Sequence, residues 1–275
     1  MSTSVAPSRG PLYKEGVREK LVERIDLAAG TRRGERDTVV DEAPLTITAR
    51  GREVAVVMRT PGEDLELVRG LLHAEAGEAL AGRALVQVAS DRVDVDAEPG
   101  ELPARSFMAT AACGVCGRVA IAALEARATT VTSDLVVDAA VLAAVPDGLR
   151  AGQTQFAATG GLHGAGLFDR AGRRLAVRED VGRHNAVDKL IGAALAEGRL
   201  PLTDHVVAVS GRLGYELAEK VVLAGAPIVV AVSAPSRLAI DVAERFGVTV
   251  CGFVRGTRMN VYSHGWRVRG PKPET

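Results

Sequence analysis

The spacing of hydrophobic positions changes along the chain and divides it into parts. Residues 1–16 are rich in Ser, Pro and Gly and show no period, which predicts a disordered tail. Further on, short alternating runs predict strands over residues 38–42, 45–49, 54–58, 83–89 and 93–97. These strands surround one predicted helix. We therefore expect a small N-terminal α+β domain over residues 17–130.

The helix of this domain has a clear start signal. Thr60 is a favoured N-cap residue, Pro61 suits the first helical position, and Glu63 completes a capping box. Apolar residues repeat along one face of the segment that follows, which predicts a helix ending near Glu75.

In the second half, helical periods alternate with short apolar runs. The predicted strands are 162–168, 175–178, 205–209, 228–232, 248–254 and 259–263, and the predicted helices are 139–149, 183–197, 215–224 and 235–246. Asp138 stands where it would cap the first of these helices. The alternation predicts a layered α/β domain with a mostly parallel sheet over residues 131–275. Such sheets bind ligands beyond the carboxyl ends of their strands.

Composition narrows the function classes. The 275 residues include 34 basic and 34 acidic side chains, so the net charge is zero, which argues against a dedicated nucleic-acid or membrane-surface binder. No apolar run reaches the roughly 18 residues that span a bilayer, and the first residues lack the apolar core of a signal peptide. Three cysteines, an odd number, fit a reducing compartment, so we expect a cytoplasmic protein.

Two of those cysteines form a Cys-x-x-Cys pair. Cys113 and Cys116 are each followed by glycine and lie between a predicted strand, 105–110, and a predicted helix, 119–128. A helix N-terminus stabilises a thiolate and lowers the pKa of a thiol. This setting favours a sulfur nucleophile or a sulfur carrier.

Other interpretations of the pair fit less well. A structural zinc site needs about four ligands, so Cys251 and histidines would have to converge on the pair. A thioredoxin-like redox pair is expected after the first strand of a βαβ unit, not in mid-chain. Burial as an inert pair is disfavoured by the flanking glycines. A persulfide carrier, which needs an accessible cysteine of low pKa, fits best.

A zinc deaminase has a related signature, His-x-Glu followed by Pro-Cys-x-x-Cys. The chain contains His73-Ala74-Glu75 ahead of the cysteine pair, but Ala112 stands where the proline would be. His73 and Glu75 also fall at the predicted end of a helix. An ordinary helix terminus is therefore the favoured interpretation.

Polar clusters follow several predicted strands of the second half. The run from Arg178 to Lys189 crosses a strand-to-helix junction, where Asp180 would cap the helix and Arg183 and His184 would meet an anionic ligand. A solvated charged turn is the alternative. The other candidates at strand ends are His163, Ser210, Arg212 and the stretch Phe253, Val254, Arg255, Gly256, Thr257 and Arg258. In that stretch, stacking on Phe253 and guanidinium contacts would suit a purine nucleotide with its pyrophosphate.

Taken together, these motifs are familiar. The segments Cys113–Gly117, Thr159–His163, Arg178–Leu190, Val232–Pro235 and Gly252–Gly256 resemble, in order, those of the FdhD family of formate dehydrogenase accessory sulfurtransferases. The resemblance runs from about residue 20 to about residue 265. One departure is the pair Gly214-Tyr215, where the family pattern has serine and phenylalanine.

The resemblance implies a fold and a function. The second domain would be cytidine-deaminase-like without zinc chemistry, and the protein would form a homodimer. It would accept persulfide sulfur from a cysteine desulfurase on Cys113, assisted by Cys116. It would pass the sulfur to bis-molybdopterin guanine dinucleotide before this molybdenum cofactor enters formate dehydrogenase. Guanine nucleotides such as GDP would bind at Phe253–Arg258. The rival hypotheses are a zinc-dependent deaminase and a cofactor chaperone whose cysteines are dispensable.

Overall fold

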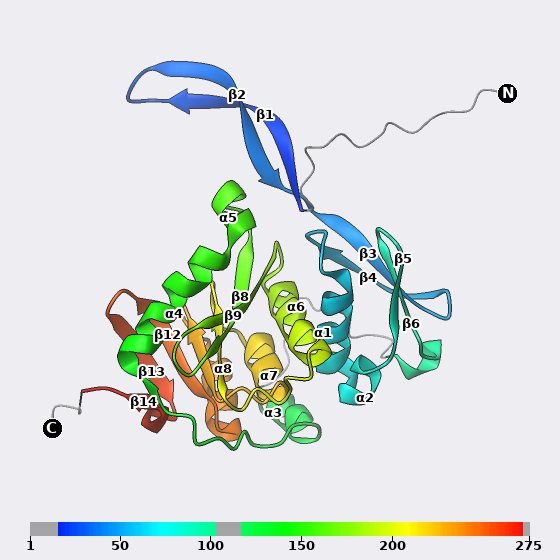
Figure 1. The fold of residues 1–275 in the computed structure, drawn as a ribbon, viewed down its shortest axis with the longest axis vertical. Helices are drawn as coiled ribbons and strands as arrows, with labels where there is room; N and C mark the ends of the chain where they lie inside the picture. The colour runs from blue at the N-terminus through cyan, green and yellow to red at the C-terminus, as the bar shows by residue number, and fades with distance from the viewer. Residues whose placement is uncertain (1–15, 103–116, 272–275) are drawn as a thin grey trace.

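The computed structural model describes residues 16–102 and 117–271 (Figure 1). The predicted tail up to residue 15, the predicted strand 105–110, and Cys113 and Cys116 lie outside these residues. Among the described helices, none is long and apolar enough to cross a bilayer.

A smaller unit is built on a four-stranded sheet in the order β4-β3-β6-β5. Its elements are β3 (Ala43–Ala49), β4 (Arg52–Arg59), α1 (Asp64–Ala76), α2 (Glu78–Ala81), β5 (Leu85–Ala89), β6 (Arg92–Val95) and the 3-10 turn η1 (Pro99–Glu101). Alternate residues of β3, Leu45 and Ile47, are fully buried against Leu67 and Leu72 of α1. The period-two and helical patterns of the sequence therefore meet in one core.

The larger unit is built on a six-stranded sheet in the order β13-β12-β11-β10-β8-β9. Its strands are β8 (His163–Asp169), β9 (Arg174–Asp180), β10 (His205–Val209), β11 (Ile228–Ala231), β12 (Thr249–Arg255) and β13 (Arg258–Ser263). Of these described strands, β10, β11 and β12 run parallel and the others pair antiparallel. The expectation of a mostly parallel sheet was therefore wrong, because the hairpins at both ends of the sheet supply antiparallel edges.

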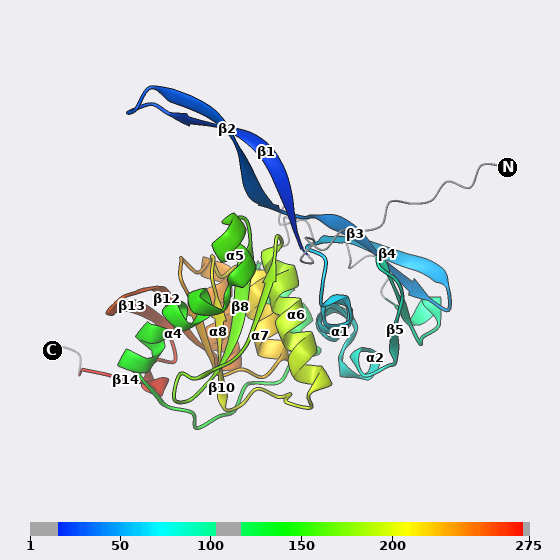
Figure 2. The same cartoon turned by 45° about the horizontal axis from the view of Figure 1, so that its top comes forward.

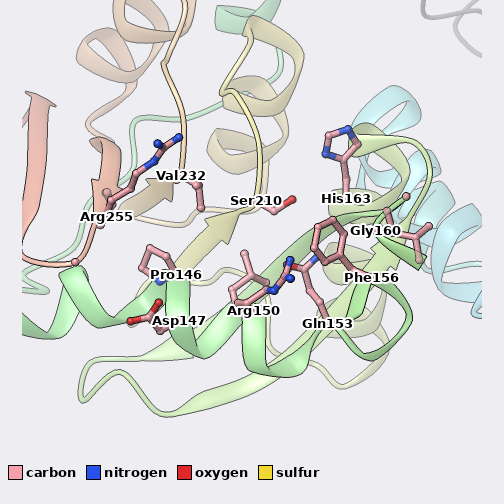
Figure 3. A pocket seen from close by; sticks show the side chains of 15 residues that line it. Pro146, Asp147, Arg150, Gln153, Phe156, Gly160, His163, Ser210, Val232 and Arg255 are labelled. Atoms are coloured by element: carbon pink, nitrogen blue, oxygen red, sulfur yellow. The ribbon is translucent and has the colours of Figure 1, made fainter. Parts of the chain in front are cut away.

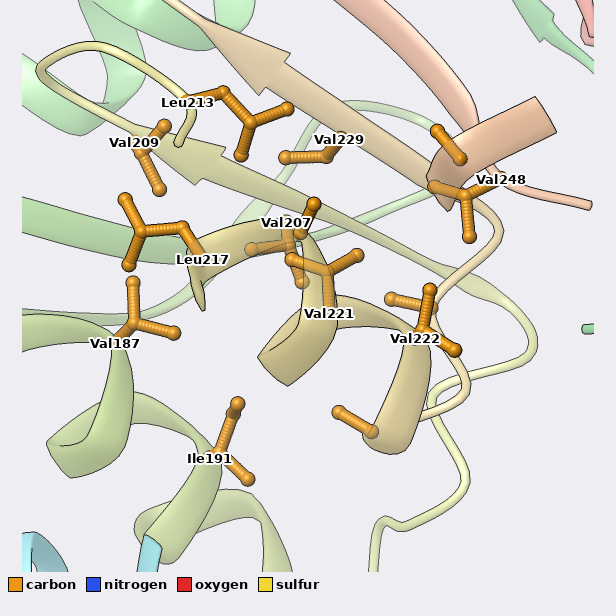
Figure 4. Packing of buried hydrophobic residues seen from close by; sticks show 14 of the residues in the cluster. Val187, Ile191, Val207, Val209, Leu213, Leu217, Val221, Val222, Val229 and Val248 are labelled. Atoms are coloured by element: carbon orange, nitrogen blue, oxygen red, sulfur yellow. The ribbon is translucent and has the colours of Figure 1, made fainter. Parts of the chain in front are cut away.

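Helices cover both faces of this sheet. The remaining elements are α3 (Gly117–Glu125), β7 (Val137–Asp138), α4 (Ala139–Gly152), α5 (Thr154–Thr159), α6 (Arg183–Ala196), α7 (Tyr215–Leu223), α8 (Arg237–Phe246), the 3-10 turn η2 (Gly265–Arg267) and β14 (Val268–Arg269). One face packs Val207 and Val229 against α6, α7 and α8 (Figure 4). The other packs Val206 and Val230 against α4. This is a mixed, layered α/β fold; the finer cytidine-deaminase-like assignment and the domain boundaries remain predictions.

A long hairpin, β1 (Val17–Asp26) with β2 (Thr31–Val40), projects from the body (Figures 1 and 2). The sequence pattern did not predict it for residues 17–37. Most of its side chains are exposed on both faces, including Leu21 and Ile25, so no buried face imposes an apolar alternation. Its base contacts α5.

The predicted cap of α1 was wrong, and the predicted cap of α4 occupies the N-cap position without a capping bond from its side chain. Helix α1 begins at Asp64, after Glu63 in a left-handed conformation, and Thr60 lies outside it. The Thr60 hydroxyl instead accepts the N–H of Val181, 3.0 Å away in the larger unit. Asp138 precedes α4 without a side-chain capping bond and pairs with Arg269 at 3.5 Å. In both cases a partner distant in sequence takes the capping group.

The two units meet where α1 crosses α6, and we call this contact the seam. A Cβ atom on Gly70 would lie 1.9 Å from the carbonyl oxygen of Asp188, and one on Gly192 would lie 1.9 Å from that of Glu66. The helices are therefore in backbone contact, and only glycine fits at the two crossing positions.

We predict that Gly192→Ala destabilises the protein, although alanine has the higher helix propensity. The clash requires the helices to move apart at a cost of about 3 kcal/mol, which lowers the thermal midpoint by roughly 6–12 °C. Gly214→Ala is the control, because a Cβ atom there meets no atom within 4 Å. Equal melting temperatures for Gly192→Ala and the unmodified protein would contradict the seam geometry.

Candidate functional site

A cavity of about 590 Å³ opens at one edge of the larger sheet (Figure 3). The parallel strands β10, β11 and β12 end there, bringing Ser210, Val232 and Arg255 to its wall. The antiparallel strand β8 starts at the same edge with His163. The cavity therefore lies beyond the carboxyl ends of the parallel strands, where α/β sheets bind their ligands.

The opposite wall comes from α4, α5 and the turn after α5. Its lining residues include Pro146, Asp147, Arg150, Gln153, Phe156, Gly160 and Gly161. The sequence analysis named the Thr159–His163 stretch, which supplies Gly160 and Gly161, but missed the side chains of α4 and α5 on this wall. The sequence predicted a helix over residues 139–149 but not what its polar face would meet.

The predicted site residues divide into two groups. His163, Ser210, Val254, Arg255 and Gly256 line the cavity, whereas Phe253, Thr257, Arg258, Arg212, Arg183 and His184 are not among its lining residues. Phe253 has a positive φ of 53° and an exposed fraction of 46%, and its N–H donates to the carbonyl of Ser233. Stacking on Phe253 inside this cavity is therefore not supported.

His163 and Ser210 both line the cavity and can form hydrogen bonds with a ligand. Burial, together with the neighbouring positive charge of Arg183, lowers the pKa of His163, so the imidazole is neutral at pH 7. The Ser210 hydroxyl accepts the N–H of Gly164 at 2.9 Å, which leaves its own hydrogen to donate. Arg150 and Arg255 line the same cavity, so together these groups suit a polar, anionic ligand.

Much of the Arg178–Lys189 run builds the seam. The side chain of Arg178 binds Glu66 of α1 through both carboxylate oxygens. Asp180 is fully buried and accepts the N–H of Thr60 at 3.1 Å. Its predicted capping role was wrong: the N-cap of α6 is Gly182, without a side-chain capping bond.

Lys189 completes this network. It is fully buried, and its Nζ atom lies 3.0 Å from Asp180 Oδ2, 3.0 Å from the Thr60 carbonyl oxygen and 3.2 Å from that of Glu179. All three ammonium hydrogens can be satisfied in this geometry. Glu63 lies 3.5 Å away, and burial raises the pKa of its carboxyl group.

Glu179 faces the cavity side of the same strand. Its carboxylate accepts the N–H groups of Gln155 at 3.0 Å and Phe156 at 2.7 Å, at the start of α5. The strand pleat sends neighbouring side chains to opposite faces, so Glu179 fixes the cavity wall while Asp180 fixes the seam.

A second cavity, of about 370 Å³, lies at the seam. It is lined by Val56, Met58, Glu75, His184, Tyr215 and Glu216, among others. His184 Nε2 lies 2.6 Å from Glu216 Oε2. Burial, followed by the positive charges of Arg183 and Lys220, lowers the pKa of His184 to about 4, so a neutral imidazole can donate to Glu216. Burial also raises the pKa of the Tyr215 hydroxyl to about 12.

Among the described residues, the groups considered for zinc chemistry do not form a cluster. His73 is buried, and its Nε2 lies 3.3 Å from the carbonyl oxygen of Leu223 at the seam. Cys251 is fully buried in β12, where burial raises the pKa of its thiol to about 12. Within residues 16–102 and 117–271, no group of three or more His, Cys, Asp or Glu side chains is placed to hold a metal ion.

Residues 40–269 match the model of the FdhD/NarQ family. The chain belongs to the FdhD/NarQ family. FdhD/NarQ relatives named "Sulfur carrier protein FdhD" include one from Nocardia farcinica, 47% identical over 254 residues that cover 85% of this chain and 89% of the relative. Another, from Mycobacterium tuberculosis, is 43% identical and covers 84% and 92%. A third, from Sulfolobus acidocaldarius, is 41% identical and covers 87% and 94%.

The fold is also similar to a solved structure. The crystal structure of a proposed formate dehydrogenase accessory protein from Desulfotalea psychrophila superposes with a TM-score of 0.75 at 25% identity. The match covers 92% of this chain and all of that one. The FdhD/NarQ assignment rests on the sequence matches, and the solved structure shows that the fold is shared.

We predict that His184→Gln reduces the acid sensitivity of the fold. The pKa of His184 is lowered in the folded state, so its stabilising contribution is present above the unfolded pKa near 6.5 and is lost as the pH falls towards 4. Between pH 7 and 4.5 the unmodified protein should lose about 2–3 kcal/mol more than the variant, measured by urea unfolding.

Asp188 titrates in the same pH range, but its pKa is raised rather than lowered, and it is present in both proteins. Burial raises its pKa to about 6, so its contribution grows as the pH falls below 6, equally in both proteins. Parallel stability curves for the two proteins would show that His184 is not held neutral at the seam.

Proposed function

We propose that this protein is a sulfur carrier that acts in the maturation of formate dehydrogenase. The observation that carries the proposal is its identity of 38–47% with proteins named "Sulfur carrier protein FdhD", over most of their length. The Desulfotalea psychrophila structure, a proposed formate dehydrogenase accessory protein, supports the same process.

Cys113 is the proposed sulfur acceptor, in the cytoplasm, where thiols stay reduced. Its thiolate attacks the outer sulfur of a persulfide on a cysteine desulfurase. One S–S bond forms on Cys113, one breaks, and the desulfurase thiolate leaves, so no external oxidant is needed. Cys116 would assist by shuttling the sulfur or by resolving a disulfide. Cys251 is unsuited to this role because it is fully buried.

The proposed acceptor substrate is bis-molybdopterin guanine dinucleotide, for which GDP is a partial mimic. The sheet-edge cavity offers what one nucleotide arm of that substrate needs. Arg255 can bind phosphate, and neutral His163 and Ser210 can form hydrogen bonds with a polar ligand. A volume of about 590 Å³ is in the range of small-molecule sites. Formate dehydrogenase is the proposed client, and a homodimer is the proposed assembly.

We predict that Cys113→Ala abolishes activation of formate dehydrogenase, because no thiolate remains to receive the sulfur. Activity would be measured in a strain that lacks the native carrier. In the unmodified protein, incubation with a desulfurase and cysteine should add one sulfur atom to the peptide that contains Cys113. Mass spectrometry detects this addition. Cys251→Ala is the control and should keep both properties. Full activation by Cys113→Ala would favour a chaperone whose cysteines are dispensable.

We predict that Arg255→Ala weakens GDP binding about tenfold, or about 1.4 kcal/mol, because a charge-assisted bond to phosphate is lost. Calorimetric titration measures the affinity. Arg258→Ala is the matched control: Arg258 pairs with Arg255 across β12 and β13 but is not a lining residue of the cavity. A larger loss for Arg258→Ala than for Arg255→Ala would place the phosphates elsewhere.

A further inference from the structure

The sheet of the smaller unit has an edge strand that borders the second cavity. In the order β4-β3-β6-β5, strand β4 pairs with β3, and no other described strand pairs with it. Three neighbouring residues of β4, Val56, Val57 and Met58, line the cavity at the seam, which we call the seam cavity. An open strand edge of this kind can accept a further strand through its backbone groups.

The register of the sheet shows which backbone groups of β4 point to the open edge. Val56 lies opposite Thr46, whose N–H donates to the carbonyl oxygen of Asp91 at 2.8 Å, next to β6. Val56 and Thr46 are therefore a non-hydrogen-bonded pair, in which both residues turn their N–H and carbonyl groups away from each other. Met58 has the same orientation two residues later, and its carbonyl oxygen accepts the Asn185 amide at 2.8 Å.

The side chains at this edge are apolar and accessible. Val56 is 47% exposed and Met58 is 50% exposed. Edge strands that stay unpaired usually carry charged side chains or proline instead. The opposite edge, β5, also exposes Val86 and Val88, but neither of them lines the seam cavity or the cavity of the larger sheet. Strand β4 thus combines an open edge, exposed apolar side chains and an adjoining cavity.

The polar side of the seam cavity is acidic. Its described lining residues include the carboxyl groups of Glu75, Asp188, Glu216 and Glu219, and the ammonium group of Lys220. Lys220 Nζ lies 2.6 Å from Asp188 Oδ1, so these two charges compensate each other. The charges of the remaining three carboxyl groups have to be balanced by other residues or by a ligand.

Within the described part of the chain, two of these three carboxyl groups have no positively charged ion-pair partner. Glu219 pairs with Arg127, but Glu216 is hydrogen-bonded to the neutral imidazole of His184. Glu75 is half-buried and forms no ion pair or hydrogen bond with another described residue. The seam cavity is therefore complementary to a positively charged group.

We propose that the β4 edge and the seam cavity bind an extended segment of a partner protein, in which a lysine or arginine lies between apolar residues. The segment adds a strand to β4 through the backbone groups of Val56 and the N–H of Met58, and its apolar side chains pack on theirs. Its basic side chain enters the cavity towards Glu75 and Glu216. This interaction goes beyond the proposed sulfur transfer and does not depend on it.

Titration of the isotope-labelled full chain with the end-blocked peptide Thr-Val-Arg-Val-Thr, followed by NMR, tests this surface. Saturable binding with a Kd below about 1 mM is expected. The amide hydrogens of Val56 and Met58 should exchange readily in the free protein and at least about tenfold more slowly in the complex. The Val57 amide, which bonds within the β3–β4 ladder, should change little. A peptide with glutamate in place of the arginine should not bind.

Matched variants separate the contributions of charge and edge. Glu75→Gln should weaken binding of the arginine peptide about tenfold, because an uncompensated carboxylate is lost. Glu53→Gln, on the same strand but outside the cavity lining, should keep the affinity within about twofold. Val56→Lys should abolish binding, because a positive charge replaces the apolar contact, whereas Val86→Lys at the opposite edge should not. Unchanged melting temperatures exclude a folding defect in these variants.

Several results would overturn the proposal. Equal binding of the arginine and glutamate peptides would refute the charge complementarity, and protection of Val86 and Val88 would place the segment at β5. Slow exchange of the Val56 and Met58 amides in the free monomer would show that another part of this chain already occupies the edge. Dimers that dissociate in Val56→Lys would show that a second copy occupies it. Absence of saturable binding would refute the surface, while sulfur loading of Cys113 would still test the proposed function separately.

Discussion

The burial of one ammonium group determines how the two units fit together. Lys189 is enclosed at the seam, and a buried charge is tolerated only when its partners are complete. Those partners are the Asp180 carboxylate and the carbonyl oxygens of Thr60 and Glu179. The segment before α1 must therefore stay extended enough to reach Lys189, which explains why Thr60 does not start the helix. Removing one member of such a pair costs about 3–5 kcal/mol.

Strand β9, which carries Asp180 and Glu179, links the seam to the cavity. Side chains of β9 alternate, so Asp180 points to the seam and Glu179 to the start of α5. The two neighbouring residues Glu179 and Asp180 therefore connect the larger sheet to both the cavity wall and the smaller unit. A cavity wall that is fixed in this way needs fewer side chains and backbone segments to be ordered when a ligand binds.

The described residues on the two sides of the segment 103–116 pack in different units. Leu102 packs in the core of the smaller sheet, and Leu124 of α3 packs in the core of the larger one. Residues 103–116, which include Cys113 and Cys116, connect these two anchor points. Because the seam fixes one unit against the other, it also fixes the two attachment points of the cysteine-bearing segment relative to the sheet-edge cavity.

Local patterns in the sequence determined most helices and strands and the family, and they predict the strand ends as the place for a ligand. The pattern of apolar residues indicates which face is buried, and this was enough to predict strands β10 to β12. It does not report what the polar face meets, so Arg150, Gln153 and Phe156 became cavity residues only when α4 and α5 packed beside those strand ends. The sequence pattern did not predict most of the hairpin β1–β2, because the hairpin buries neither face. Tertiary structure alone decided that the Arg178–Lys189 run largely holds the two units together, since its partners in the smaller unit, such as Glu66 and Thr60, come from a distant part of the chain.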